Sequence, residues 1–286
     1  MKVLLIATPS PLSHAVTQWF DMRGRSYQEV TPDQLPALTL GDLAGSLVLD
    51  IATLTALQAG NALSITGEAR HHLVELAEKA DCPLLFLSDG RVFDGDEAPL
   101  NHRETEKPQP GSVAGGRLTA VERLLESHIE KHLVLRTGPV FSEQGQNFFT
   151  GLYKNLVAGG PIPLNSTLKT CPTYVSDLSR VISALIDQIA SGAQNWGSYH
   201  YNSSGQTSAY EFAEVMLAFA SQHVDLSKAK TSLEILESGA RIEPSIPVLR
   251  CEKILHHFGI KQLPWRAHLP QPVKHLCEGK LKGKQA

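Results

Sequence analysis

Short apolar runs alternate with stretches of helical periodicity along the first half of the chain. The runs that we expect to form buried strands are 3–7, 45–51, 83–87 and 132–137. Apolar residues spaced three and four apart predict helices over 68–80 and 118–129, and a further helix is expected to start at Leu12. Strands that alternate with helices form a parallel sheet covered on both faces. The pattern therefore predicts an α/β protein with a Rossmann-type, doubly wound parallel sheet.

The second half is less regular and predicts a smaller lobe. The expected helices are 147–157, 176–190, 208–221 and 251–258, and the expected strand is 197–202. Ser208 and Glu211 have the spacing of a capping box, and Gly259 is placed to end the last helix. The polar tail from Glu278 is expected to be solvated and frayed. We predict a Rossmann-like nucleotide-binding domain over 1–145 and a partly interleaved substrate-binding lobe over 146–286, with a cleft between them.

Composition excludes several classes of function. A formal net charge of −3 gives no basic surface for nucleic acid, and no apolar run approaches the roughly 20 residues that a membrane span requires. No metal site is expected, because no cysteine pair has zinc-site spacing. A cytoplasmic protein with reduced thiols is therefore the expectation. The four scattered cysteines are Cys82, Cys171, Cys251 and Cys277.

The turn after the first strand carries no glycine. It reads Ala-Thr-Pro-Ser-Pro-Leu-Ser over 7–13, where a dinucleotide fold normally places glycines so that the backbone can approach a pyrophosphate. Two prolines also remove backbone N–H donors. A serine hydroxyl can still bond a phosphate, and a helix N-terminus favours anions. Ser10 and Ser13 are accordingly the predicted cofactor-binding positions of this turn.

Several segments, in order, resemble the dTDP-4-dehydrorhamnose reductases, which are extended short-chain dehydrogenases with a nucleotide-sugar domain. The stretch FLSDGRVFDG at 86–95 resembles that family's Ser-Thr-Asp-Tyr-Val-Phe-Asp-Gly pattern. LRT at 135–137 with NF at 147–148, CPTYVSDL at 171–178 and the segment 199–213 match further family motifs. The resemblance covers almost the whole chain. The family also contains the regulatory β subunit of methionine adenosyltransferase, so this fold does not by itself imply reductase activity.

The resemblance implies NAD(P)H as hydride donor, a tyrosine as proton donor and a lysine four residues later. Here the tyrosine position falls on Val113 or Ala114, and the lysine position on Arg117 or Leu118. The sequence has no tyrosine over 28–152 and no lysine over 108–130, so a shifted alignment does not restore the pair. Neither Val nor Ala has a proton to transfer. Arg117 keeps a positive charge that would suit a ribose or phosphate.

Two other catalytic positions of the family are also replaced. The residue that polarises the carbonyl falls on Asp89, whose carboxylate would repel a developing oxyanion. The asparagine of the neighbouring helix falls on Thr66. We interpret Asp50 and Asp89, at the ends of two strands, as solvated or helix-capping carboxylates rather than a metal pair. The substrate-binding positions that the resemblance implies are Asp89, Arg91, Thr173, Tyr174 and Asn202, with Arg91 placed to meet a phosphate.

Three hypotheses of function follow. The preferred one is a non-catalytic relative that binds a nucleotide or nucleotide-sugar or regulates a protein partner. The second is an NAD(P)H-dependent nucleotide-sugar oxidoreductase rebuilt around Asp89 and Arg117, and only this one requires NADP or NAD. The third is a protein-interaction subunit with an empty cleft. A homodimer is left open in each.

Overall fold

The computed structural model describes residues 1–58, 65–95, 101–226 and 232–283, and its centre is a parallel sheet. The strands are ordered β2-β1-β3-β4-β6-β10, and every neighbouring pair is parallel. Their bounds are β1 Lys2–Ile6, β2 Tyr27–Val30, β3 Ser46–Asp50, β4 Leu84–Asp89, β6 His132–Thr137 and β10 Gly197–Tyr201.

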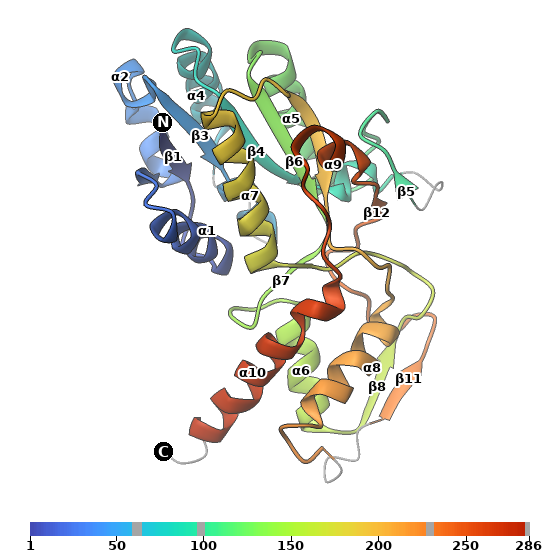
Figure 1. Ribbon diagram of the computed structural model, residues 1–286. Helices are drawn as coiled ribbons and strands as arrows, with labels where there is room; N and C mark the ends of the chain where they lie inside the picture. The colour runs from blue at the N-terminus through green and yellow to red at the C-terminus, as the bar shows by residue number, and fades with distance from the viewer. Residues whose placement is uncertain (59–64, 96–100, 227–231, 284–286) are drawn as a thin grey trace.

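Helices cover both faces of this sheet (Figure 1). Successive residues of β1 point to opposite faces, so Val3 and Leu5 join one apolar core, and Leu4 and Ile6 join the other. The first core takes α1 (Pro11–Met22), α7 (Val175–Ala190) and α9 (Glu252–Phe258), and the second takes α4 (Gly67–Lys79) and α5 (Val113–His128). The predicted α/β, Rossmann-type architecture is confirmed.

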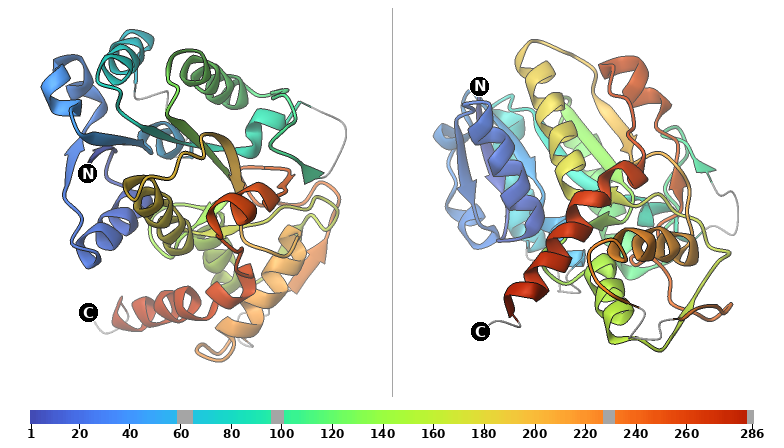
Figure 2. Two further views of the ribbon diagram at one scale, coloured as in Figure 1. Left: turned by 45° about the horizontal axis from the view of Figure 1, so that its top comes forward. Right: turned by 60° about the horizontal axis from the view of Figure 1, so that its bottom comes forward.

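A smaller lobe lies beside one end of the sheet (Figures 1 and 2). It contains α6 (Phe148–Ala158), α8 (Ala209–Ala220), α10 (Pro270–Gly283) and a parallel strand pair, β8 (Pro161–Leu164) with β11 (Ser232–Ile235). A third apolar core fills it. The tail expected to fray from Glu278 instead continues α10 to Gly283, because Val273 and Cys277 pack into this core and anchor the helix.

The chain passes between the two lobes several times. α7 and β10 come from the second half of the sequence but belong to the layers of the main sheet. Two short parallel pairs also join distant segments, β7 (Val140–Phe141) with β9 (Thr173–Tyr174), and β5 (Asn101–His102) with β12 (Val248–Leu249). The remaining short helices are η1 Pro32–Ala37, α2 Leu40–Leu43, α3 Ala52–Gln58, η2 Gly90–Phe93 and η4 Trp265–His268.

Helix ends follow local chemistry. The Ser208 hydroxyl accepts from the Glu211 N–H while the Glu211 carboxylate accepts from the Ser208 N–H, which is the predicted capping box. Gly259 ends α9 in the left-handed conformation, also as predicted. α5 begins at Val113, five residues before the predicted start, because the Ser112 hydroxyl caps it by accepting from the Gly115 N–H. Across the described ranges, no helix is long and apolar enough to cross a membrane.

Candidate functional site

A cavity of about 550 Å³ lies where the strand order reverses. The chain moves from β1 to β2 on one side and places β3 on the other, which opens a crevice beyond the carboxyl ends of these strands. The β1–α1 turn, α3, the segment around 140–147, Val175 and the pair Glu243-Pro244 line it. We call this the switch-point cavity.

The two serines of the β1–α1 turn bond to each other. The Ser10 N–H donates to Ser13 Oγ at 2.9 Å, and the Ser13 N–H donates to Ser10 Oγ at 3.1 Å. Ser10 lines the switch-point cavity, whereas Ser13 is buried and outside its lining. Pro9 and Pro11 have no N–H to offer. Four of the turn's residues therefore offer no free backbone donor to a pyrophosphate: two prolines have none, and two serines use theirs in capping α1.

The charge of the switch-point cavity also opposes a dinucleotide. Among the described residues that line it, none is a lysine or arginine, and Glu243 supplies a carboxylate. Arg117 is exposed on α5 and does not line the cavity. Buried phosphate charge needs hydrogen-bonded or cationic partners. The residues present do not fit NAD(P) as the family fold would bind it.

A second cavity, of about 570 Å³, lies in the smaller lobe. Residues of α6, β8, α8 and the segment 236–243 line it, and we call it the lobe cavity. Arg241 is the cation among its described lining residues. Glu243 lines both the lobe cavity and the switch-point cavity, so the two adjoin at this residue.

The residues that the motifs align with the family's catalytic positions include no tyrosine and no lysine. Val113 is 73% exposed at the start of α5 and lines neither cavity. Thr66 caps α4, where its hydroxyl accepts from the Ala69 N–H at 3.2 Å. Among the described lining residues of both cavities there is no tyrosine and no lysine.

Two tyrosines in other parts of the chain are also poorly suited to donating a proton. Tyr153 lies in the core of the smaller lobe, and burial with the nearby Cys277 raises its pKa. Tyr174 donates to Glu143 at 3.1 Å, and burial with the Glu143 charge raises its pKa as well. A general acid works best with a pKa near the working pH, and both shifts move away from it.

Asp89 and Arg91 form a closed, buried ion pair. The Arg91 Nε donates to both Asp89 oxygens at 3.0 and 2.9 Å, and its Nη2 donates to Oδ2 at 2.6 Å. Burial raises the pKa of Asp89, and the Arg91 charge opposes that shift. We expected Arg91 to meet a phosphate and Asp89 to face a ligand, but the strand end turns the two side chains toward each other. Neither lines either cavity.

Asp50 has a separate arginine partner. Its Oδ2 accepts from Arg70 on α4, and its Oδ1 accepts from the Ala52 N–H at 3.0 Å. Asp50 and Asp89 are thus each paired with an arginine, and both are buried rather than solvated. Each also caps a short helix, as the second alternative for these carboxylates predicted. Within the described ranges no group of three or more acidic, histidine or cysteine residues is placed to hold a metal ion.

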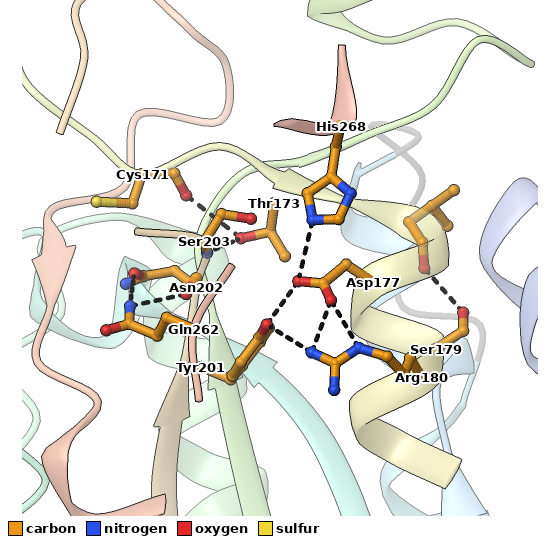
Figure 3. Close-up of polar contacts among 11 residues, drawn as sticks. Cys171, Thr173, Asp177, Ser179, Arg180, Tyr201, Asn202, Ser203, Gln262 and His268 are labelled. Atoms are coloured by element: carbon orange, nitrogen blue, oxygen red, sulfur yellow. Dashed lines mark hydrogen bonds and ion pairs between the residues drawn. The ribbon is translucent and has the colours of Figure 1, made fainter. Parts of the chain in front are cut away.

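Two of the remaining predicted substrate positions, Thr173 and Asn202, belong to a polar network (Figure 3). Thr173 Oγ1 donates to the Cys171 carbonyl at 3.3 Å and accepts from the Ser203 N–H at 3.2 Å. Asn202 donates to the Leu249 carbonyl at 2.9 Å and accepts from Gln262 at 2.9 Å. These contacts satisfy both side chains, and neither residue lines either cavity, nor does Tyr174.

Asp177 is the centre of the neighbouring cluster (Figure 3). Its buried carboxylate accepts from the Tyr201 hydroxyl at 2.5 Å and from Arg180 at 2.7 Å. His268 Nε2, from η4 of the smaller lobe, lies 3.7 Å from the same carboxylate. The hydrogen bonds of the cluster join α7 to β10, and His268 of η4 lies beside them, so the Asp177 carboxylate is occupied by its own neighbours.

A second buried network of hydrogen bonds joins β4, α5, β6 and β10. Arg136 donates to Glu122 at 2.7 Å, and Ser88 donates to the same carboxylate at 2.6 Å. His200 completes it, with Nε2 3.3 Å from Arg136 Nη1 and Nδ1 3.2 Å from the Arg250 carbonyl. Arginine can only donate, so the His200 ring is neutral, with Nε2 accepting and Nδ1 donating. Burial, together with Arg136, lowers the pKa of His200 well below its ordinary value.

We expect the stability of the protein to fall below pH about 6.5 because of His200. Its pKa is depressed only in the folded state, so unfolding takes up a proton once the pH drops below the unfolded pKa. The loss is about 1.4 kcal/mol for each pH unit until the folded pKa is reached. Urea unfolding at pH 7 and pH 5 measures it. His200→Gln should flatten the slope, and the exposed His256→Gln should leave it unchanged; equal slopes in all three proteins would contradict the assignment.

Sequence reasoning missed the residues that line the cavities most distinctively. Gln58, Arg241 and Glu243 lie in segments without a family motif, and their place became apparent only from the fold. The predicted turn around Ser10 and the Asn147-Phe148 motif did mark the neighbourhood, because Asn147 lines one cavity and Phe148 the other.

Comparison with solved structures shows that the chain shares its fold with proteins of the Rossmann type. It superposes on a dTDP-4-dehydrorhamnose reductase from Clostridium acetobutylicum with a TM-score of 0.75 at 19% identity, covering 96% of this chain and 99% of that one. A dTDP-4-dehydrorhamnose reductase from Bacillus anthracis, solved in complex with NADP, gives 0.74 at 17% identity, covering 97% and 99%.

Sequence comparison identifies the family. The pattern of the RmlD substrate binding domain matches residues 38–277, and the chain belongs to that family. A dTDP-4-dehydrorhamnose reductase from Sinorhizobium fredii is 26% identical over 254 residues, which is 85% of each chain. The enzyme of that name from Aggregatibacter actinomycetemcomitans is 27% identical over 219 residues, or 74% of each. The resemblance read from the motifs is confirmed.

Proposed function

We propose that this chain is a non-catalytic member of the reductase-like family that binds a nucleotide-sugar. One observation carries the proposal: the place of the proton-donating tyrosine is taken by Val113 or Ala114, and no described tyrosine or lysine lines either cavity. Proton donation is a step that the reduction of a ketone requires. Members of the family named as reductases act on a dTDP-linked sugar, and the retained fold supports a ligand of the same class.

The lobe cavity supports binding of the nucleotide part. Arg241 lines it and offers a guanidinium, which recognises phosphate with paired hydrogen bonds. Apolar side chains of α6 and β8 surround the rest of the cavity, as in most small-molecule sites. A regulatory role would further require a protein partner, which stays a prediction.

A rebuilt reductase site around Asp89 and Arg117 has less support. Asp89 is held by Arg91 away from both cavities, and Arg117 is exposed on α5. The β1–α1 turn also offers fewer free backbone donors to NADP or NAD, because it has two prolines and its two serines bond to each other. The features required for hydride transfer are therefore changed in three separate places.

Calorimetric titration with dTDP and dTDP-glucose tests the proposal. We expect both to bind, and Arg241→Met to weaken dTDP binding about 10-fold or more, because a hydrogen bond to a charged group contributes about 1.5–3 kcal/mol. Arg123→Met, an exposed change on α5 outside both cavities, is the matched control.

An absorbance assay with NADPH and a dTDP-4-keto sugar completes this test. We expect the rate of NADPH oxidation to equal that of buffer. Failure of both nucleotides to bind, or saturable NADPH oxidation, would refute the proposal.

A further inference from the structure

We propose that the switch-point cavity holds an uncharged sugar group instead of the pyrophosphate of a dinucleotide. The inference rests in part on the proposed function, because one source of that sugar is a bound nucleotide-sugar. The other source is a free monosaccharide, which presents the same hydroxyl chemistry.

The electrostatics of the cavity exclude a phosphate but not a sugar. The described lining residues include no cation, and Glu243 adds a negative charge. The backbone donors of Ser10 and Ser13 are used by their capping box. A phosphate placed there would lose its hydration and gain no compensating charge. A hydroxylated, neutral group loses much less on entering the cavity and can donate to the carboxylate.

The hydrogen-bonding groups of the cavity suit hydroxyls. Gln58 lines it, and its Nε2 is buried without a hydrogen-bond partner. Such an orphaned donor is costly to leave unsatisfied, and a ligand oxygen would pair with it. Gln144 and Gln146 also line the cavity and are exposed, so their amides can donate or accept. Amides and a carboxylate together match groups that both donate and accept.

The cavity favours a sugar over a nucleoside base. Bases are held by stacking on aromatic faces. Phe141 is the aromatic residue of the described lining, and it is fully buried among four other rings, Phe148, Phe149, Tyr174 and Phe212. Its face is thus not free for a ligand. Without a stacking surface, hydrogen bonding is the recognition that the cavity provides.

The position of Glu243 connects this cavity to the proposed nucleotide site. Glu243 lines both cavities, and Arg241, two residues earlier, lines the lobe cavity. A nucleotide-sugar with its phosphates at Arg241 can therefore extend its sugar past Glu243 toward Gln58. The sugar end of this single ligand would then occupy the space that a cofactor occupies in the fold family.

Calorimetry with dTDP and dTDP-glucose on matched variants tests the inference. We expect wild-type protein to bind dTDP-glucose at least 10-fold more tightly than dTDP. Gln58→Leu should reduce this ratio several-fold while leaving the affinity for dTDP unchanged. Glu243→Gln should also reduce the ratio, but because Glu243 lines both cavities its removal should strengthen dTDP binding as well. Gln222→Leu, exposed and outside both cavities, is the control. Thermal unfolding of each variant verifies folding, and the exposed Glu243 keeps the test valid if Gln58→Leu is destabilised.

Saturation-transfer NMR with free glucose tests the cavity assignment without any nucleotide. We expect a glucose signal with wild-type protein that Gln58→Leu diminishes. If neither nucleotide binds but the glucose signal behaves in this way, the proposed function fails and the cavity assignment stands. Equal affinities for dTDP and dTDP-glucose without a glucose signal, unaltered ratios in both variants, or NADPH binding in the micromolar range would overturn the inference.

Discussion

Replacing Arg91 with methionine is expected to lower the free energy of unfolding by about 3–5 kcal/mol, because it leaves a buried carboxylate without its partner. Asp89 is fully buried and Arg91 is 8% exposed, and the guanidinium meets the carboxylate through three hydrogen bonds. Urea unfolding followed by the fluorescence of the three tryptophans measures the loss. A loss of this size would indicate that the Arg91 guanidinium stays bound to the Asp89 carboxylate in solution.

A double-mutant cycle separates the pair from its surroundings. Asp89→Asn with Arg91→Met should be less destabilised than the sum of the two single changes, since neither partner then stays charged and alone. Lys79→Met, which breaks the exposed pair of Lys79 with Glu75, is the control and should cost less than about 1 kcal/mol. A loss below about 1 kcal/mol for Arg91→Met would mean that the guanidinium is free to meet a ligand.

The outcome bears directly on function. Asp89 stands where the family has the residue that polarises the substrate carbonyl. A closed ion pair at this position supports the fold and keeps the Asp89 carboxylate bound to Arg91. The second network, around Glu122 and Arg136, is closed in the same way and also lies outside both cavities. We therefore expect the buried charges of these two networks to act on stability in this chain.

The layers of the fold could be read from the sequence because they depend on local patterns. The apolar run at 3–7 alternates between two cores, and the helical spacing over 68–80 places Leu73 and Ala77 on the second of them. β8 and β11 were not predicted, because each is short and has no apolar run of its own. They form a pair only because the smaller lobe brings them together.

The site could be predicted only as far as its neighbourhood. The turn without glycine was correctly placed at the crevice, where Ser10 lines the switch-point cavity. Pairing of side chains was beyond the sequence, since nothing in the order Asp89-Gly90-Arg91 indicates that the two charged groups turn toward each other. Gln58 and Glu243 are almost 200 positions apart, and only the tertiary fold brings both to one cavity.

Substitution of Gly115 and of Gly116 by alanine is expected to change stability in opposite directions, although the two residues are neighbours in α5. A Cβ at Gly115 would overlap the Arg91 carbonyl oxygen and lie 3.0 Å from Pro110 Cβ. Relief requires α5 and η2 to move apart, which we expect to cost about 3 kcal/mol. A Cβ at Gly116 meets nothing within 4 Å, so Gly116→Ala should gain about 0.5–1 kcal/mol from helix propensity.

Both variants carry a glycine-to-alanine change in the same helix and have the same composition. Urea unfolding therefore compares them without any difference other than the position of the change. η2 contains Arg91, and its close approach to α5 holds the Asp89–Arg91 pair in the space between the strand end and the helix. Gly115→Ala should therefore also reduce the coupling energy measured for that pair, whereas Gly116→Ala should preserve it. Equal stabilities for the two alanine variants would show that η2 does not pack tightly against α5. In that case this packing would not be what keeps the ion pair closed.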